Sequence, residues 1–133
     1  ADGLAILKNR RNAENPVVFH CFGGNRSEAR AVLDLGCFFS FTGTITFRKA
    51  ELIQAVAGYV PLDRVLLETD CPYLSPEPKR NVRPNEPALL VHTAAKLAEL
   101  RGVSLEEIAQ VTTYNCRYFF GMDDIMDSVS KLD

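Results

Sequence analysis

The sequence predicts an α/β fold in which short parallel strands alternate with amphipathic helices. Three apolar runs, 16–20, 37–41 and 64–70, are too uniformly hydrophobic for strands with one wet face, so we expect them to be buried strands of a parallel sheet. Segments 25–35 and 48–58 separate these runs and carry apolar residues at helical spacing. The expected order is therefore strand, helix, strand, helix, strand.

Local signals mark where the first elements begin and end. A short helix is expected up to about Asn12, ahead of the first strand. Asn25 follows two glycines and has the side chain of a helix N-cap, and Gly36 is expected to end the helix that Asn25 begins. The aromatic residues of 37–41 stand at strand spacing inside a buried run, which predicts that they pack in the core.

A long loop and further helices follow the third strand. Five prolines between Cys71 and Ala88 exclude both a helix interior and a central strand. Asn85 is expected to cap the helix after this loop, and Ser104 to open another helix through a capping box. Residues 115–120 form a last apolar stretch. A loop of this length in a compact domain is usually functional or disordered.

The length of the chain limits how complete the sheet can be. A chain of 133 residues with 47% hydrophobic residues can bury one core. Three strands make a poor independent sheet, whereas a closed barrel of eight β/α units takes about 250 residues. We therefore expect the C-terminal part of a TIM-type (β/α)8 barrel, cut from something longer, with a partial barrel domain at 1–121 and an acidic tail at 122–133.

Composition restricts the partners and the compartment. The formal net charge of -2 excludes a broad basic surface that grips nucleic acid along its length. Four cysteines without a Cys-x-x-Cys pair are expected to be reduced thiols. We expect neither a membrane span, which needs about 20 apolar residues, nor a secretory leader. These features predict a cytoplasmic protein without a membrane partner.

His20 and Asp70 are the first candidates for chemistry, because they close the first and third predicted strands. In a parallel sheet both side chains emerge at the carboxyl edge, where α/β enzymes place their reactive groups. An imidazole suits zinc, manganese or iron, and a carboxylate can hold a hard cation or take a proton from metal-bound water. A structural role for each is the alternative. Glu68 points to the same face as Asp70, either as a buried partner that orients the site or as a catalytic group.

Two groups of residues are candidates for binding a phosphate or a polyanion. Asn25 and Arg26 follow the glycine pair at a helix start, where free backbone N–H groups suit a phosphate, although such turns are common without a ligand. Residues 79–83 form the densest basic cluster and stand in the loop directly after Asp70. Arg83 is the best single candidate for contacting substrate, and a solvated loop is the alternative reading.

Five runs of the sequence resemble the TatD family of metal-dependent hydrolases, and the resemblance covers nearly the whole chain to about Gly121. The most specific is the run at 61–74, whose Leu-Glu-Thr-Asp-Cys-Pro-Tyr-Leu portion is long and ordered. The others are His-Cys-Phe-Gly-Gly at 20–24, Ser-Phe-Thr-Gly at 40–43, Arg-Pro-Asn-Glu-Pro at 83–87 and Thr-Tyr-Asn at 113–115.

This resemblance implies a barrel in which a His-x-His on the first strand, a mid-barrel Glu, two later His and a last-strand Asp hold divalent metals. His20 matches the later of the two His and Asp70 the last-strand Asp, which implies that both are metal ligands and that Asp70 accepts the proton of the attacking water. The other ligands have no counterpart in this chain. The resemblance therefore implies two ions of Mg, Mn or Zn only in the complete enzyme.

The resemblance further implies a deoxyribonuclease in which metal-activated water attacks DNA phosphodiester bonds, so that DNA is the expected partner. Two alternatives remain open. One is a metal-dependent hydrolase of ester or amide bonds in small or tRNA-linked substrates. The other is a non-catalytic, truncated barrel that self-associates through its open sheet edge. In each case the isolated chain is expected to carry an incomplete catalytic site.

Overall fold

The computed structural model describes residues 2–10 and 15–122, and in it three parallel strands form one sheet in the order β1-β2-β3. The strands are β1 Val18–Phe19, β2 Phe38–Phe41 and β3 Val65–Leu67. Phe39 in the central strand pairs with Phe19 on one side and Val65 on the other. The predicted parallel α/β arrangement is confirmed, with strands shorter than the apolar runs that predicted them.

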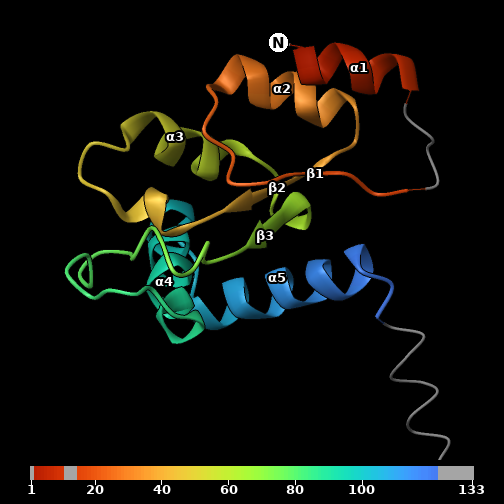
Figure 1. Cartoon of the computed structure of the whole chain (residues 1–133). Helices are drawn as coiled ribbons and strands as arrows, with labels where there is room; N and C mark the ends of the chain where they lie inside the picture. The colour runs from red at the N-terminus through yellow and green to blue at the C-terminus, as the bar shows by residue number, and fades with distance from the viewer. Residues whose placement is uncertain (1, 11–14, 123–133) are drawn as a thin grey trace, which may run out of the picture.

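The helices form an arc around the sheet, from α2 through α3 and α4 to α5, with each helix contacting the next (Figure 1). The α-helices are α1 Asp2–Arg10, α2 Arg26–Asp34, α3 Glu51–Tyr59, α4 Leu90–Arg101 and α5 Leu105–Phe119. Short 3₁₀ turns are η1 Gly43–Thr46, η2 Leu62–Arg64 and η3 Pro87–Leu89. Because helices connect parallel strands, the carboxyl ends of all three strands meet at one edge.

The core lies between the sheet and the arc of helices. Phe39 and Phe41 of β2 are fully buried, as the aromatic run predicts, together with Leu97 of α4 and Ile108 of α5. The ring of Phe22 meets that of Phe39 edge to face, with 5.0 Å between their centroids. The central strand is thus enclosed on both faces, which explains why its sequence carries no alternation.

Most of the predicted element boundaries are confirmed. Asn25 caps α2 through a capping box, Ser104 caps α5, and Gly36 takes a φ of 63° just after α2. Residues 115–120 are not a separate element, because α5 continues through them to Phe119. The predicted end of the first helix at Asn12 and the tail from residue 123 lie outside the described residues.

The prediction that Asn85 caps a helix is wrong. Glu86 is the N-cap of η3, and Asn85 is only 4% exposed. Its side-chain amide instead donates to the backbone carbonyls of Thr69 and Tyr73, in the loop after β3. A buried amide satisfies its hydrogen-bonding groups where carbonyls are available, and here the folded loop supplies them.

Two absences hold for the part of the chain that the structure describes. No helix there is long and apolar enough to cross a membrane. None of the four cysteines, all within the described residues, forms a disulfide bond.

Candidate metal centre

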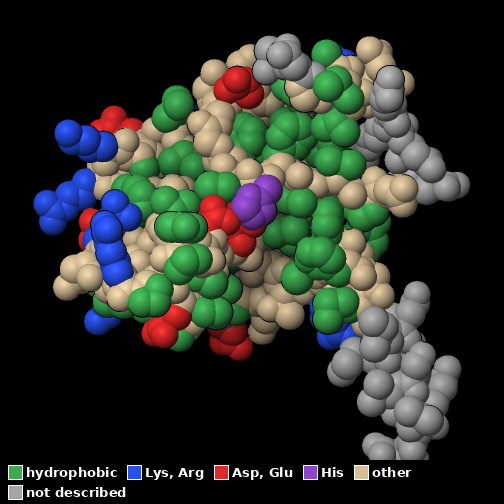
Figure 2. All heavy atoms as spheres, in the orientation of Figure 1, with side chains coloured by type: hydrophobic (Ala, Val, Ile, Leu, Met, Phe, Trp, Pro, Cys, Tyr) green, Lys and Arg blue, Asp and Glu red, His purple; other side chains and the backbone are tan. Residues whose placement is uncertain are grey.

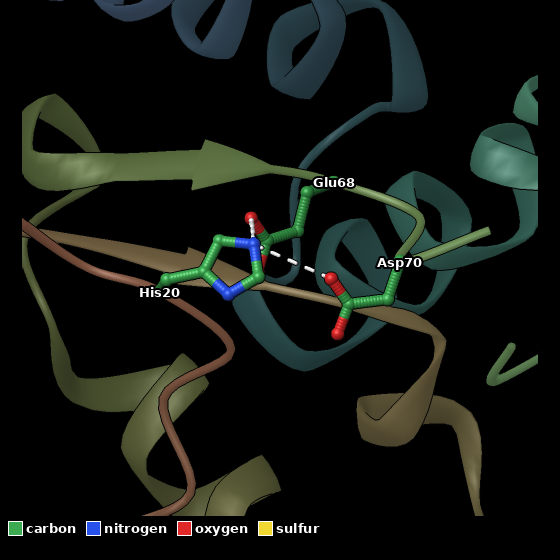
Figure 3. A group of neighbouring side chains, drawn as sticks. All are labelled: His20, Glu68 and Asp70. Atoms are coloured by element: carbon green, nitrogen blue, oxygen red, sulfur yellow. Dashed lines mark ion pairs between the residues drawn. The ribbon is translucent and has the colours of Figure 1, made fainter.

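Three side chains with metal-binding atoms meet at the carboxyl edge of the sheet, and Figure 3 shows them pointing toward one another. His20 Nε2 lies 2.8 Å from Glu68 Oε2 and 3.3 Å from Asp70 Oδ1. Each residue offers one ligand atom, and these three atoms lie within 4.8 Å of one another. The structure therefore brings His20 and Asp70 together, as the strand-end pattern predicts, and adds Glu68 to form a His-Glu-Asp cluster.

His20 is presented by the chain immediately after β1. The strand ends at Phe19, and Cys21 takes a left-handed backbone conformation with a φ of 45°, which turns the chain out of the strand. The Cys21 backbone N–H donates to Glu68 Oε1 at 2.7 Å and to Ser40 Oγ at 3.2 Å. The His20 side chain stays 62% exposed, so its imidazole is open to an ion from solvent.

Glu68 is the most enclosed member of the cluster, with a side chain 19% exposed. Its backbone N–H donates to the Phe41 carbonyl at 3.1 Å, which continues the contact between the β2 and β3 segments beyond the end of β3. One carboxylate oxygen accepts the Cys21 N–H, and the other faces His20. Glu68 therefore contacts both the backbone of the turn after β1 and the His20 imidazole.

Asp70 stands in a constrained turn beyond β3. Its φ of 54° lies in the left-handed region, which non-glycine residues adopt at a cost in free energy. Asn85 donates to the carbonyls of Thr69 and Tyr73, on either side of Asp70, at 2.8 and 2.5 Å. The Tyr73 N–H closes the turn onto the Asp70 carbonyl at 2.9 Å. These bonds hold the Asp70 carboxylate beside His20.

Two further residues contribute to this edge, although their sequence pattern predicts no such role. One is Asn85, whose place inside the Arg-Pro-Asn-Glu-Pro run was the available signal. The other is Cys21, whose thiol lies 3.5 Å from the Thr42 hydroxyl. Burial raises the pKa of the Cys21 thiol; the charge of Asp70 raises it further, and the contact with Thr42 opposes the shift. Burial and the Asp70 charge thus both favour the neutral thiol over the thiolate.

The predicted substrate-binding residues lie in different surroundings. Asn25 Oδ1 accepts the Glu28 N–H at 3.0 Å inside the capping box of α2. The guanidinium of Arg26 lies 4.1 Å from the centroid of the Tyr59 ring of α3. Arg83 is exposed, and within the described residues its guanidinium has no hydrogen bond or ion pair. Substrate binding by Asn25, Arg26 and Arg83 stays a prediction.

The cluster has the chemistry of a site for a divalent cation. An imidazole nitrogen and carboxylate oxygens are ligands of zinc and manganese, and carboxylates also bind magnesium. All three donors converge at an edge that solvent reaches, so the donor set fits the predicted cofactor, and the identity of the metal stays a prediction. A parallel α/β sheet with such donors at its carboxyl edge defines the class of candidate metal-dependent α/β enzymes.

Comparison with known proteins assigns the chain to a family within this class of metal-dependent enzymes. The family model described as TatD related DNase matches residues 1–121. An Escherichia coli K12 protein, named uncharacterized metal-dependent hydrolase YcfH, is 48% identical over 92% of this chain and 46% of its own length. A Klebsiella pneumoniae protein, named 3′-5′ ssDNA/RNA exonuclease TatD, is 40% identical over 90% of this chain and 47% of its own. The chain belongs to the TatD family.

A solved structure agrees with this assignment. The crystal structure of YjjV, a TatD homolog from Escherichia coli K12, matches with a TM-score of 0.79 and 32% identity. The match covers 89% of this chain and 45% of that one. The chain therefore spans about half the length of the relatives that it matches.

Proposed function

We propose that this chain is the C-terminal part of a TatD-type (β/α)8-barrel hydrolase that cleaves phosphodiester bonds of DNA at a divalent-metal centre. The convergence of His20, Glu68 and Asp70 at the carboxyl edge of the sheet carries the proposal. The description of the matching family as TatD related DNase, and the relative named as a 3′-5′ ssDNA/RNA exonuclease, support a nucleic-acid substrate. The cytoplasmic location stays a prediction.

Two surfaces support the view that further strands complete the barrel. Within the described residues, β1 and β3 each pair on one side only. A groove of about 570 Å³ lies against α4 and α5, and its apolar lining includes Leu67, Leu90 and Leu105. An exposed apolar groove of this size is typical of a surface that another element covers. In a closed barrel, neighbouring strands and helices would cover both surfaces.

Each residue of the cluster would have a separate role in the hydrolysis. A bound divalent ion supplies a water of lowered pKa and neutralises charge on the phosphodiester. His20 would hold the ion through Nε2 and Asp70 through a carboxylate oxygen. Asp70 would also accept the proton of the attacking water, and Glu68 would hold the turn that presents His20 through the Cys21 N–H. Arg83 would contact a substrate phosphate, because its planar guanidinium donates two parallel hydrogen bonds to phosphate oxygens.

The test is divalent-metal-dependent hydrolysis of labelled single-stranded DNA by the purified protein, with and without chelator. Asp70→Asn is expected to lower the rate by about 10³-fold, the contribution typical of a general base. His20→Ala is expected to lower the affinity for Mn²⁺ in a calorimetric titration. Matched controls are His92→Ala on α4 and Asp34→Asn on α2, which lie outside the cluster. Hydrolysis that survives Asp70→Asn unchanged would contradict the assignment.

Two other outcomes would replace the proposal. Hydrolysis of acyl esters, with none of DNA, would favour an ester or amide hydrolase on the same metal scaffold. An inactive chain that forms dimers in light scattering would favour the second candidate, a partial barrel that self-associates. The unpaired outer sides of β1 and β3 favour that candidate, because exposed strands recruit partners.

A further inference from the structure

The loop after β3 encloses a hollow whose lining begins at Pro72, two residues along the chain from Asp70 of the His-Glu-Asp cluster. Its volume is about 410 Å³, and it is lined by Pro72, Tyr73, Leu74, Ser75, Arg80 and Arg83. Tyr73 follows Asp70 by three residues and is 74% exposed. We propose that this hollow is a subsite for one nucleotide of a single-stranded polynucleotide, in which the Tyr73 ring stacks on a base and Arg83 contacts the neighbouring phosphate. The inference rests on the proposed function and names how its substrate is held.

Hydrogen bonds tie this hollow to the cluster. Asn85 donates to the carbonyls of Thr69 and Tyr73, so one side chain fixes the backbone on both sides of Asp70. The Asn85 backbone N–H also donates to the Pro72 carbonyl at 3.0 Å. Asn85 is fully enclosed, and Arg83 stands two residues before it. The base-binding ring, the free guanidinium and the Asp70 carboxylate are therefore carried by one connected turn.

Hydrogen bonds and close packing within the loop support the walls of the hollow. Ser75 is buried, and its hydroxyl donates to the Val82 carbonyl at 2.6 Å, across the loop. Arg80 donates to the Ser75 carbonyl at 3.3 Å and lies 3.8 Å above the ring of Phe47. At Gly43 a Cβ atom would overlap the Leu74 carbonyl oxygen, so the loop packs directly on the backbone after β2. A subsite whose walls are held by such bonds loses little conformational entropy on binding.

The chemistry of the lining favours a single-stranded nucleic acid over an acidic peptide. An exposed aromatic ring beside a free guanidinium offers a base-stacking surface and a phosphate contact, the combination that proteins use for unpaired strands. An acidic peptide would contact the Lys and Arg side chains but would leave the Tyr73 ring without a stacking partner. Figure 2 shows Lys and Arg side chains gathered over the loops after η1 and β3, at one side of the face that carries the cluster. The positive charge of these loops is a local patch, since the chain as a whole carries a formal net charge of -2.

The test measures binding by fluorescence anisotropy in the presence of chelator, so that no hydrolysis intervenes. The probes are a short labelled oligothymidylate and an abasic strand of the same length. Tyr73→Leu removes the ring, Tyr73→Phe keeps it, and Arg83→Gln removes the cation. Tyr114→Leu and Arg30→Gln are matched controls, because both side chains are exposed and lie outside the hollow and the basic loops. Thermal melting verifies that each variant folds.

Tyr73→Leu is expected to weaken binding of the oligothymidylate by about tenfold, within the range for losing one base–aromatic stack, and to spare the abasic strand. Tyr73→Phe should bind like the unchanged protein. Arg83→Gln should weaken both probes and reduce the salt dependence of log affinity by about 0.7, as expected for one phosphate contact on a single strand. Both controls should bind within about twofold of the unchanged protein, a shift too small for a lost stack.

Three results would overturn the subsite. They are no binding of the oligothymidylate by the unchanged protein, a Tyr73→Leu effect no larger than that of Tyr114→Leu, and an equal loss on both probes. These results are separable from the proposed function. Tyr73-dependent binding without metal-dependent hydrolysis would keep the subsite and reject the nuclease, whereas hydrolysis that is indifferent to Tyr73 and Arg83 would do the reverse.

Discussion

A buried asparagine donates hydrogen bonds to the backbone at each end of β3. One asparagine stabilises the fold, and the other holds the geometry of the candidate metal site. At the amino end, Asn115 of α5 donates to the carbonyls of Leu62 and Val65 at 2.7 and 2.8 Å. Beyond the carboxyl end, Asn85 donates to two carbonyls of the turn that carries Asp70. Asn115 joins a helix to the sheet, whereas Asn85 joins a loop to itself.

The two asparagine amides bond to backbone segments of different conformation. The backbone at the amino end adopts ordinary conformations, and Asn115 adds packing of α5 against β3. The backbone at the carboxyl end contains Asp70 at a φ of 54°. Such a conformation persists only where its surroundings over-determine it. The same residue type with the same bonding pattern therefore stabilises the fold at one end and holds a reactive side chain at the other.

Asn115→Ala should have the largest effect on stability. It leaves two carbonyls of the η2–β3 segment without their donor, so the free energy of unfolding should fall by about 3 kcal/mol. The affinity for Mn²⁺ should be unchanged in the folded protein. Urea denaturation measures the first quantity and calorimetry the second. Gln110→Ala, on the exposed face of α5, is the control. If Asn115→Ala lowered the free energy of unfolding by less than about 1 kcal/mol, Asn115 would not differ from Asn85 in its contribution to stability as proposed.

Asn85→Ala should act on the site more than on the fold. Loss of its bonds frees the turn around Asp70, and the affinity for Mn²⁺ should fall by about 30-fold, within the range for partners that orient metal ligands. The free energy of unfolding should fall by about 2 kcal/mol, less than for Asn115→Ala. Equal Mn²⁺ affinity before and after the substitution would mean that Asn85, like Asn115, serves the fold alone.

Glu68→Gln tests the link between the cluster and the turn after β1. The amide oxygen can still accept the Cys21 N–H, but the negative charge facing His20 is lost. We expect the affinity for Mn²⁺ to fall by about tenfold, with little change in melting temperature. Glu99→Gln, an exposed carboxylate on α4, is the matched control. An unchanged affinity would restrict Glu68 to a structural role.

Asn25→Ala gives the smallest expected effect and sharpens the comparison with a third asparagine. Its side chain caps α2, so the substitution should lower the free energy of unfolding by about 1 kcal/mol, and Asn25→Ser should restore it. Neither variant should alter Mn²⁺ affinity. If Asn25→Ser, which keeps the cap, weakens binding of single-stranded DNA, the predicted substrate role of Asn25 gains support.

The pattern of the sequence predicts much of the fold because it reflects local and periodic constraints. Uniformly apolar runs predicted three buried parallel strands, and the N-caps at Asn25 and Ser104 are local signals that the structure confirms. The positions of His20 and Asp70 at strand ends predicted that they meet, because parallel strands share one carboxyl edge. These predictions need only spacing and residue type.

Only the tertiary structure decided which distant groups complete the site. The Asn85 amide bonds to carbonyls 16 and 12 residues away, and Glu68 accepts an N–H from Cys21, 47 residues away. By itself the sequence determined the strand order along the chain, the caps and the strand-end residues, since these depend on neighbours in the chain. The role of Asn85 and the hollow in the loop after β3 depend on hydrogen bonds between segments that approach only when the loop folds, so the Arg-Pro-Asn-Glu-Pro run marks Asn85 without specifying its partners.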